Sequence, residues 1–163
     1  MIQHGASFIH PPLGIHPTDS DKFKIFLAGS IEMGAAEDWQ SKVTWDVRDF
    51  RDKVIFMNPR RPDWDNTWQQ SITDPNFKEQ VNWELDMLAS SDMVVFYFDP
   101  NTLSPISLLE LGLYAATKKK VLVCCPKGYW RRGNIEVICD KYGIPLFESY
   151  EEWIEEIKKN IIW

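Results

Sequence analysis

Short apolar runs and longer amphipathic stretches alternate along most of the chain. We expect strands at the apolar runs, which cover residues 23–28, 54–57, 93–98, 121–125 and 144–147. The stretches between them repeat apolar residues at helical spacing and predict helices at 35–50, 75–89, from 105 onward, at 134–142 and at 150–161. Continuous apolar strands between helices are typical of a parallel sheet covered on both faces. The pattern therefore predicts an α/β three-layer sandwich with a five-stranded parallel sheet, flavodoxin-like or Rossmann-like in its winding.

The first 22 residues do not follow this pattern. They contain Pro11, Pro12 and Pro17 and show no helical or strand period. We expect residues 1–22 to form an arm that is either laid over the surface or disordered. Residues 23–163 are then one domain, of a size that can bury a single core.

Ligands of such sheets bind beyond the carboxyl ends of the strands, near the point where the strand order reverses. Three segments should meet there. They are the turn Gly29-Ser30 after the first strand, the loop 58–65 after the second, and the loop from Asp99 to Ser104 after the third. Ser104 and Pro105 also resemble a helix cap followed by a first helical residue.

Two residue types in the loop 58–65 suit a nucleotide or nucleoside. Arg60 can recognise a phosphate, although paired arginines on loops are more often solvated or bound to nearby acids. Trp64 can stack on a base, or it can pack against another subunit.

Glu110 is an unusual residue for its position. It lies between Leu109 and Leu111, less than two turns into a helix whose other residues are mostly apolar. Because a buried carboxylate is costly without partners, it either faces the ligand crevice or binds backbone groups or an arginine as a structural acid.

Glu84 is the second candidate acid. Phe77, Val81, Leu85 and Leu88 form an apolar stripe on the preceding helix, and Glu84 lies at its border. Paired carboxylates serve chemistry at a sugar anomeric carbon, where one attacks and another group manages the proton of the leaving group. The alternative is a border residue that faces solvent.

Composition and charge exclude several classes. The formal net charge of −6 argues against a nucleic-acid polymer as a partner. No stretch approaches the ~18 apolar residues that span a membrane, and the three cysteines are an odd number. We therefore expect a cytoplasmic protein with reduced thiols. The absence of G-x-G-x-x-G and Walker patterns argues against dinucleotide cofactors and NTP hydrolysis.

The sequence resembles the nucleoside 2-deoxyribosyltransferase family and its relatives, the 2′-deoxynucleoside 5′-phosphate N-hydrolases. The resemblance covers about residues 23 to 147. It is carried by Ile25-Phe-Leu-Ala-Gly-Ser30, by Asn82-Trp-Glu-Leu-Asp-Met-Leu88 leading into Ser91-Asp-Met-Val-Val95, and by Glu110-Leu-Gly112.

The resemblance implies a flavodoxin-like fold and a covalent intermediate formed when Glu110 attacks C1′ of a deoxyribosyl group. A free nucleobase then takes the sugar in a transferase, or water takes it in a hydrolase, without a metal or organic cofactor. Glu84 matches a residue that contacts the base and helps to protonate it. Asn134 resembles an Asn that a neighbouring subunit contributes to the sugar 5′ end, which implies a homo-oligomer of two or more subunits.

Two questions stay open at this point. Ser104 falls where the transferases often carry an Asp, whereas the nucleotide hydrolases are similar to this chain there and in the Gly-Ser-Ile turn. The substrate is therefore a nucleoside or a nucleotide. A catalytically silent nucleotide-binding module with the same fold is the remaining alternative.

Overall fold

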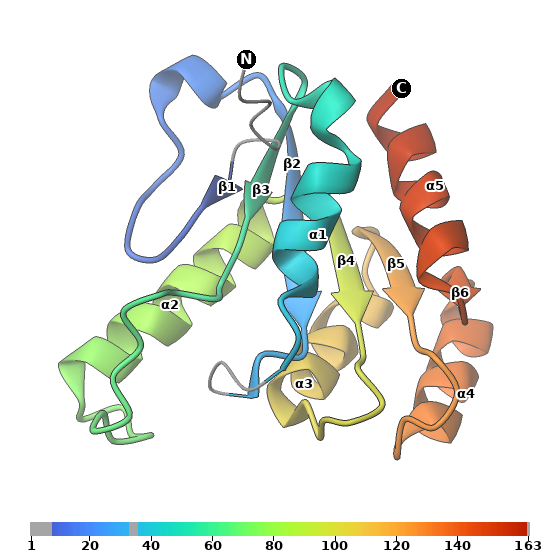
Figure 1. Cartoon of the computed structure of the whole chain (residues 1–163). Coiled ribbons are helices and arrows are strands. Elements are labelled where there is room, and N and C mark those ends of the chain that lie inside the picture. The colour runs from blue at the N-terminus through green and yellow to red at the C-terminus, as the bar shows by residue number, and fades with distance from the viewer. Residues whose placement is uncertain (1–7, 33–35, 163) are drawn as a thin grey trace.

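The structure is a computed structural model that describes residues 8–32 and 36–162. Its centre is a parallel sheet in the order β1-β3-β2-β4-β5-β6 (Figure 1). The strands are β1 (Phe8–Ile9), β2 (Phe23–Gly29), β3 (Val54–Met57), β4 (Met93–Tyr97), β5 (Lys120–Cys124) and β6 (Leu146–Phe147). Without β1, the strands lie in the order β3-β2-β4-β5-β6. When these five strands are numbered along the chain, this is the order 2-1-3-4-5 of flavodoxin-like folds. The predicted α/β fold class is confirmed.

The sheet has six strands in the described residues, so the predicted number of five was one too low. The additional strand, β1, lies in the N-terminal arm and pairs parallel to β3 with Phe8 opposite Phe56 and Ile9 opposite Met57. Two residues are too few to leave a periodic pattern in the sequence, which is why the hydrophobic pattern did not show it. Further along the arm, the Trp83 indole donates a hydrogen bond to the Leu13 carbonyl at 2.8 Å.

Among the described residues, five α-helices cover the two faces of the sheet. They are α1 (Trp39–Asp46), α2 (Pro75–Ser90), α3 (Pro105–Ala115), α4 (Arg132–Tyr142) and α5 (Tyr150–Ile162). Helices α1 and α5 lie on one face, and α2, α3 and α4 lie on the other (Figure 1). Asp74 caps α2, because its carboxylate accepts hydrogen bonds from the backbone N–H groups of Asn76 and Phe77.

The helix predicted at 35–50 is shorter in the structure. Residue 35 lies outside the described residues, and α1 begins at Trp39 because the Asp38 carboxylate accepts the Ser41 N–H at 3.2 Å. After Asp46 the chain continues into a separate 3₁₀ helix, Arg48–Phe50.

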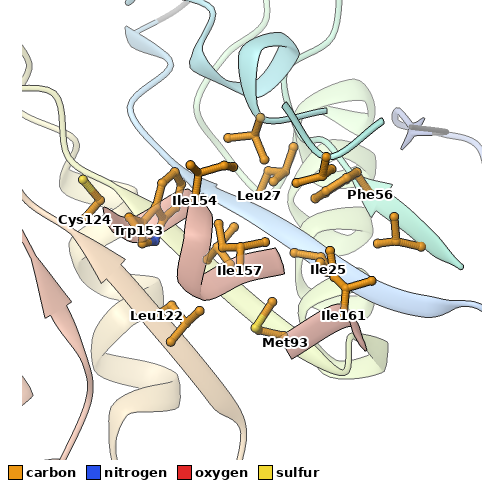
Figure 2. Close-up of a cluster of buried hydrophobic side chains, with 14 of the residues drawn as sticks. Ile25, Leu27, Phe56, Met93, Leu122, Cys124, Trp153, Ile154, Ile157 and Ile161 are labelled. Atoms are coloured by element: carbon orange, nitrogen blue, oxygen red, sulfur yellow. The ribbon is translucent and has the colours of Figure 1, made fainter. Parts of the chain in front are cut away.

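Each face of the sheet has its own apolar core. On the α1 and α5 side, Ile25, Leu27, Trp153 and Ile157 belong to one cluster of buried side chains (Figure 2). On the other side, side chains of β4 and β5 pack against α2, α3 and α4. Burial of large apolar side chains on both faces stabilises each by about 1.5–3 kcal/mol and fixes the helices over the sheet.

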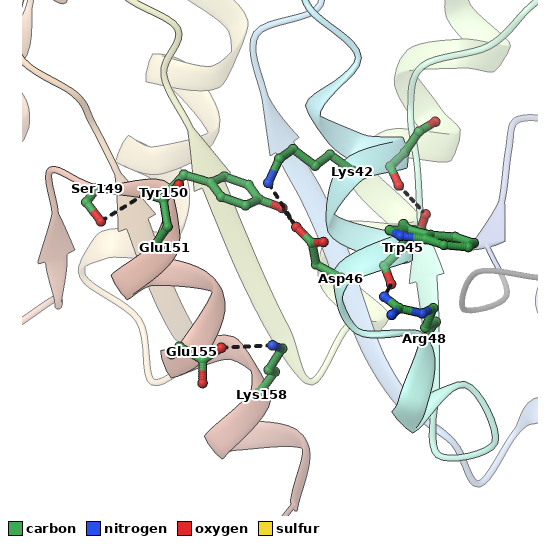
Figure 3. A network of polar contacts seen from close by, with 11 residues as sticks. Lys42, Trp45, Asp46, Arg48, Ser149, Tyr150, Glu151, Glu155 and Lys158 are labelled. Carbon is green, nitrogen blue, oxygen red and sulfur yellow. Dashed lines mark hydrogen bonds and ion pairs between the residues drawn. The ribbon is translucent and has the colours of Figure 1, made fainter.

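A polar contact joins α1 to α5 at the edge of the first core. The Tyr150 hydroxyl donates a hydrogen bond to Asp46 at 2.8 Å, and Lys42 pairs with the same carboxylate at 2.9 Å (Figure 3). The Lys42 ammonium also lies 3.4 Å from the centre of the Tyr150 ring. This arrangement holds α1 against α5 and leaves the opposite face of the sheet to carry the candidate site.

Candidate active site

The strand order reverses between β2 and β4, and the turn after β2 is built for close packing at this point. Gly29 has a φ of 152°, and a Cβ added there would lie 2.3 Å from the Tyr97 carbonyl oxygen and 2.8 Å from the Trp39 ring. The Trp39 indole donates to the Ser30 carbonyl at 3.0 Å. Gly29 therefore allows β2, β4 and α1 to meet at the carboxyl edge of the sheet.

Three buried hydroxyl groups join this turn to the loop after β4. Ser30 Oγ lies 2.6 Å from Thr102 Oγ1 and 2.6 Å from Ser104 Oγ, and it accepts the Asp99 N–H at 2.9 Å. Ser30 is fully buried, and Thr102 and Ser104 are nearly so. The predicted meeting of these loops is present, but these hydroxyl groups bind one another and hold the loop in place.

Asp99 and Ser104 also shape this loop. The Asp99 carboxylate accepts the Asn101 backbone N–H at 2.8 Å and so shapes the loop itself. Ser104 precedes α3 in a left-handed conformation, and its side chain makes no capping hydrogen bond. A short hydroxyl side chain can reach either the helix or its buried neighbours, and here it reaches Ser30 and Thr102.

Glu110 lies on α3, on the side of that helix that faces the sheet. Only 7% of the residue is exposed, and the part of the chain that the structure describes offers its carboxyl group no hydrogen bond. Burial and the neighbouring charge of Glu84 raise the pKa of Glu110 well above its ordinary value. A carboxyl group with this combination of burial and missing partners is a candidate for chemistry on a bound ligand.

Glu84, on α2, is the second acid of the pair. It is half-buried, and its Oε1 accepts a hydrogen bond of 2.7 Å from the Gln80 amide. Burial raises the pKa of Glu84, and the hydrogen bond from Gln80 opposes that rise. The structure therefore brings Glu84 close enough to Glu110 for its charge to raise the pKa of Glu110.

Residues of the loop after β3 support Glu84 through Gln80. The Gln80 amide also donates to the Pro59 carbonyl at 3.2 Å, and its oxygen accepts a hydrogen bond from Arg61 at 3.3 Å. Arg61 in turn forms a two-point ion pair with Asp63, with distances of 2.8 and 2.9 Å. Gln80 was not predicted, although its position one turn before Glu84 was a usable signal.

Arg60 and Trp64 lie in the same loop. The Arg60 guanidinium donates to the backbone carbonyls of Ala36 and Glu37 at 2.9 and 3.1 Å, so it holds the start of α1. Trp64 packs against Trp68 with ring centres 5.2 Å apart, and its indole nitrogen is buried without a hydrogen-bond partner in the described residues. Arg60 thus has a structural task, while Trp64 keeps an unused donor.

Asn134 is exposed in the first turn of α4, and no contact among the described residues joins it to Glu110 or Glu84. The resemblance assigns Asn134 to the site of a neighbouring subunit.

Gln40 and Glu32 were missed by the sequence reasoning. Gln40 is fully buried on α1, and neither polar atom of its amide has a partner in the described residues. Glu32 follows the turn after β2, and its Oε1 accepts the backbone N–H groups of Leu103 and Ser104 at 3.0 and 2.8 Å. Glu32 thus holds the two residues that precede α3, and its contacts more than 70 residues away left no sequence signal.

Within residues 8–32 and 36–162, no group of three or more His, Cys, Asp or Glu side chains is arranged to hold a metal ion. None of the helices in these ranges combines the length and apolar character needed to cross a membrane.

A flavodoxin-like sheet with two neighbouring carboxyl groups on the helices of one face is a candidate site for acid–base or nucleophilic chemistry on a small molecule. The chain belongs to the nucleoside 2-deoxyribosyltransferase-like family, whose model matches residues 22–129. This match confirms the resemblance predicted from the sequence.

The fold is also similar to the crystal structure of a conserved protein from Enterococcus faecalis V583. The two share 16% sequence identity with a TM-score of 0.62, and the similarity covers 85% of this chain and 99% of the other. At this identity the likeness concerns the fold alone. None of the curated proteins compared with the chain matches its sequence.

Proposed function

We propose that the protein is a nucleoside 2-deoxyribosyltransferase that moves the sugar of a 2′-deoxynucleoside to a second, free nucleobase. The observation that carries the proposal is Glu110, a nearly buried carboxyl group that has no hydrogen bond among the described residues and lies close to Glu84. The family match supports the same chemistry.

In the proposed first step, an oxygen of Glu110 forms a bond to C1′ as the bond from C1′ to the base nitrogen breaks. The electron pair of that bond stays with the base, which takes a proton from the carboxyl pair. The raised pKa values of Glu110 and Glu84 support this role, since a pair that shares one proton can supply both an acid and a nucleophile.

The second step reverses the first with a different base. A nitrogen of the incoming base attacks C1′, the bond to Glu110 breaks, and the base returns its proton to the carboxyl pair. Glu110 and Glu84 are then as they were at the start. Two displacements at C1′ retain the configuration of the sugar.

Several properties of the site support this assignment of roles. Gln80 directs the Glu84 carboxylate through a 2.7 Å hydrogen bond, and Trp64 offers an aromatic ring in the adjacent loop. We propose that Glu84 faces the departing base and that Trp64 stacks on it. Gly29, Ser30, Asp99 and Ser104 form the base of the sugar site.

We further propose that the working enzyme is a homo-oligomer in which Asn134 of one copy completes the site of another. The outer side of α3 supports this, because Ile106, Leu109 and Leu113 are between 50% and 60% exposed. A helix whose outer side is this apolar is usually covered by a partner. The three cysteines, all buried free thiols, fit a reaction in the cytoplasm.

A hydrolase of 2′-deoxynucleoside 5′-phosphates is the second candidate, and its first step is the same. A silent nucleotide-binding module is the third. The hydrolase requires a phosphate site, yet Arg60 and Arg61 already bind backbone carbonyls and Asp63. These contacts favour the transferase.

One experiment separates the three candidates. The protein is incubated with 2′-deoxynucleosides or their 5′-monophosphates, with and without a second free base, and the products are identified by mass spectrometry. A new nucleoside supports the transferase, whereas free deoxyribose or its phosphate supports the hydrolase. If neither forms, the proposed function is wrong. Glu110→Gln should abolish product, while Glu152→Gln, an exposed acid on α5, should not.

A further inference from the structure

The two residues that precede α3 already bind a carboxylate of the chain. The N–H groups at a helix start attract anions and are a common site for phosphate. Here Glu32 Oε1 accepts the N–H groups of Leu103 and Ser104, whereas Oε2 has no hydrogen bond in the described residues. Glu32 adopts a φ of 46° in doing so. A carboxylate of the chain itself therefore lies where a phosphate group would otherwise find two donors.

The same helix carries the independent sign of a ligand. Glu110 is 7% exposed and lacks a hydrogen bond among the described residues, so its carboxyl group is available to a bound molecule. It lies six residues after Ser104, or about 9 Å along the helix at ~1.5 Å per residue. In the proposed reaction C1′ lies at Glu110 and the base lies toward Glu84, which directs the C4′ and C5′ atoms of the sugar away from α2. The start of α3 is then within reach of the 5′ substituent.

The charges around this end of the site are unfavourable to a phosphate. Glu32, Glu84 and Asp99 contribute carboxyl groups, whereas the guanidinium groups of Arg60 and Arg61 are bound elsewhere. Arg131 is an exposed cation on this side, since it lies over Trp130, which donates to the Leu103 carbonyl. One exposed arginine is screened by solvent and does not offset a carboxylate at the helix start.

We propose that Glu32 determines specificity at the sugar 5′ end by excluding a 5′-phosphate, so that the site takes 2′-deoxynucleosides with a free 5′-hydroxyl group. Glu32 Oε2 accepts the hydrogen bond of that hydroxyl, while the carboxylate repels a phosphate that approaches the same place. This inference rests on the proposed function, and it selects the nucleoside over the nucleotide as substrate.

The test compares kcat/KM for deoxyadenosine and thymidine with kcat/KM for their 5′-monophosphates. Wild-type protein should prefer the nucleosides. Glu32→Gln, which removes the charge, should reduce that preference at least about tenfold, which corresponds to about 1.4 kcal/mol. Glu37→Gln is the matched control. Glu37 lies in the same loop between β2 and α1, and no hydrogen bond joins its side chain to α3 in the described residues. Glu37→Gln should leave the preference unchanged.

Two outcomes overturn the inference while the proposed function survives. One is wild-type turnover of a monophosphate as efficient as that of its nucleoside. The other is an equal effect of Glu32→Gln and Glu37→Gln on the preference. If Glu32→Gln does not fold, Glu32→Asp is the second variant. It retains the negative charge and should retain the preference for nucleosides, so loss of that preference in Glu32→Asp would contradict the inference. If the protein shows no turnover, calorimetry measures the binding of the same two nucleosides and their two monophosphates. Equal affinity for nucleosides and monophosphates refutes the inference, and no binding of any of the four ligands refutes both proposals.

Discussion

Replacing Glu110 by glutamine should stabilise the protein at neutral pH. Burial and the charge of Glu84 raise the pKa of Glu110 in the folded protein, whereas an unfolded glutamate titrates near its ordinary value of about 4.3. Below that value both states bind the proton, so the full contribution of Glu110 to stability is present. As the pH rises toward the raised pKa, the unfolded state loses its proton first and the free energy of unfolding falls.

The magnitude follows from this linkage. Between the unfolded and the folded pKa, the wild-type protein should lose at most about 1.4 kcal/mol of stability per pH unit from this group. Glutamine does not titrate, so the advantage of Glu110→Gln should grow over the same interval and then level off. For a chain of this length, about 1 kcal/mol corresponds to roughly 2–4 °C in Tm.

The assay is thermal unfolding of wild-type protein, Glu110→Gln and Glu152→Gln between about pH 4 and pH 8, the range in which most native proteins remain folded. Glu152 is exposed on α5 and is the control for the loss of one carboxylate. The reasoning is refuted if the Glu110→Gln advantage is absent or independent of pH, or if Glu152→Gln shows the same growth.

Three further predictions follow from the structure. Glu84→Gln should lower turnover by a factor of about 10²–10⁴ through loss of proton transfer. The acid limb of the pH–rate profile should also move to lower pH, because the variant removes a charge that raises the pKa of Glu110. An unchanged profile would argue against the pairing of Glu84 with Glu110. Gln40→Met should leave the free energy of unfolding unchanged or raise it by about 1–3 kcal/mol, since it removes a buried amide that has no hydrogen-bond partner in the described residues, and a clear loss in urea unfolding would contradict this. Gly29→Ala places a Cβ 2.3 Å from the Tyr97 carbonyl oxygen and should cost at least about 1–3 kcal/mol; a wild-type urea midpoint would show that the turn adapts freely.

The hydrophobic pattern predicted most of the fold because a parallel sheet must bury both faces. Strands such as Met93–Tyr97 are continuous apolar runs, as is typical of a strand that has helices packed on both faces of its sheet. β1 is different, since Phe8 and Ile9 join the sheet only by pairing with Phe56 and Met57. A two-residue strand depends on its neighbour and carries too little pattern to be read alone.

The candidate site was predictable in part for a similar reason. Glu110 was identified because a carboxyl group in an apolar helix is costly to bury, and that cost is local to the sequence. The hydrogen bond between Ser30 and Ser104 could not be predicted from the sequence, because it joins residues 74 positions apart. The contacts of Glu32 with the start of α3 are of the same kind and involve a residue type that is common in loops.

The most direct test of the account is the intact mass of the protein after it is mixed with a 2′-deoxynucleoside and quenched in acid. The account predicts a mass gain of one 2-deoxyribosyl group, located by peptide mapping on the segment that contains Glu110. The adduct should disappear when a second free base is added before the quench, and it should not form in Glu110→Ala. Turnover at the wild-type rate by Glu110→Ala would contradict the account.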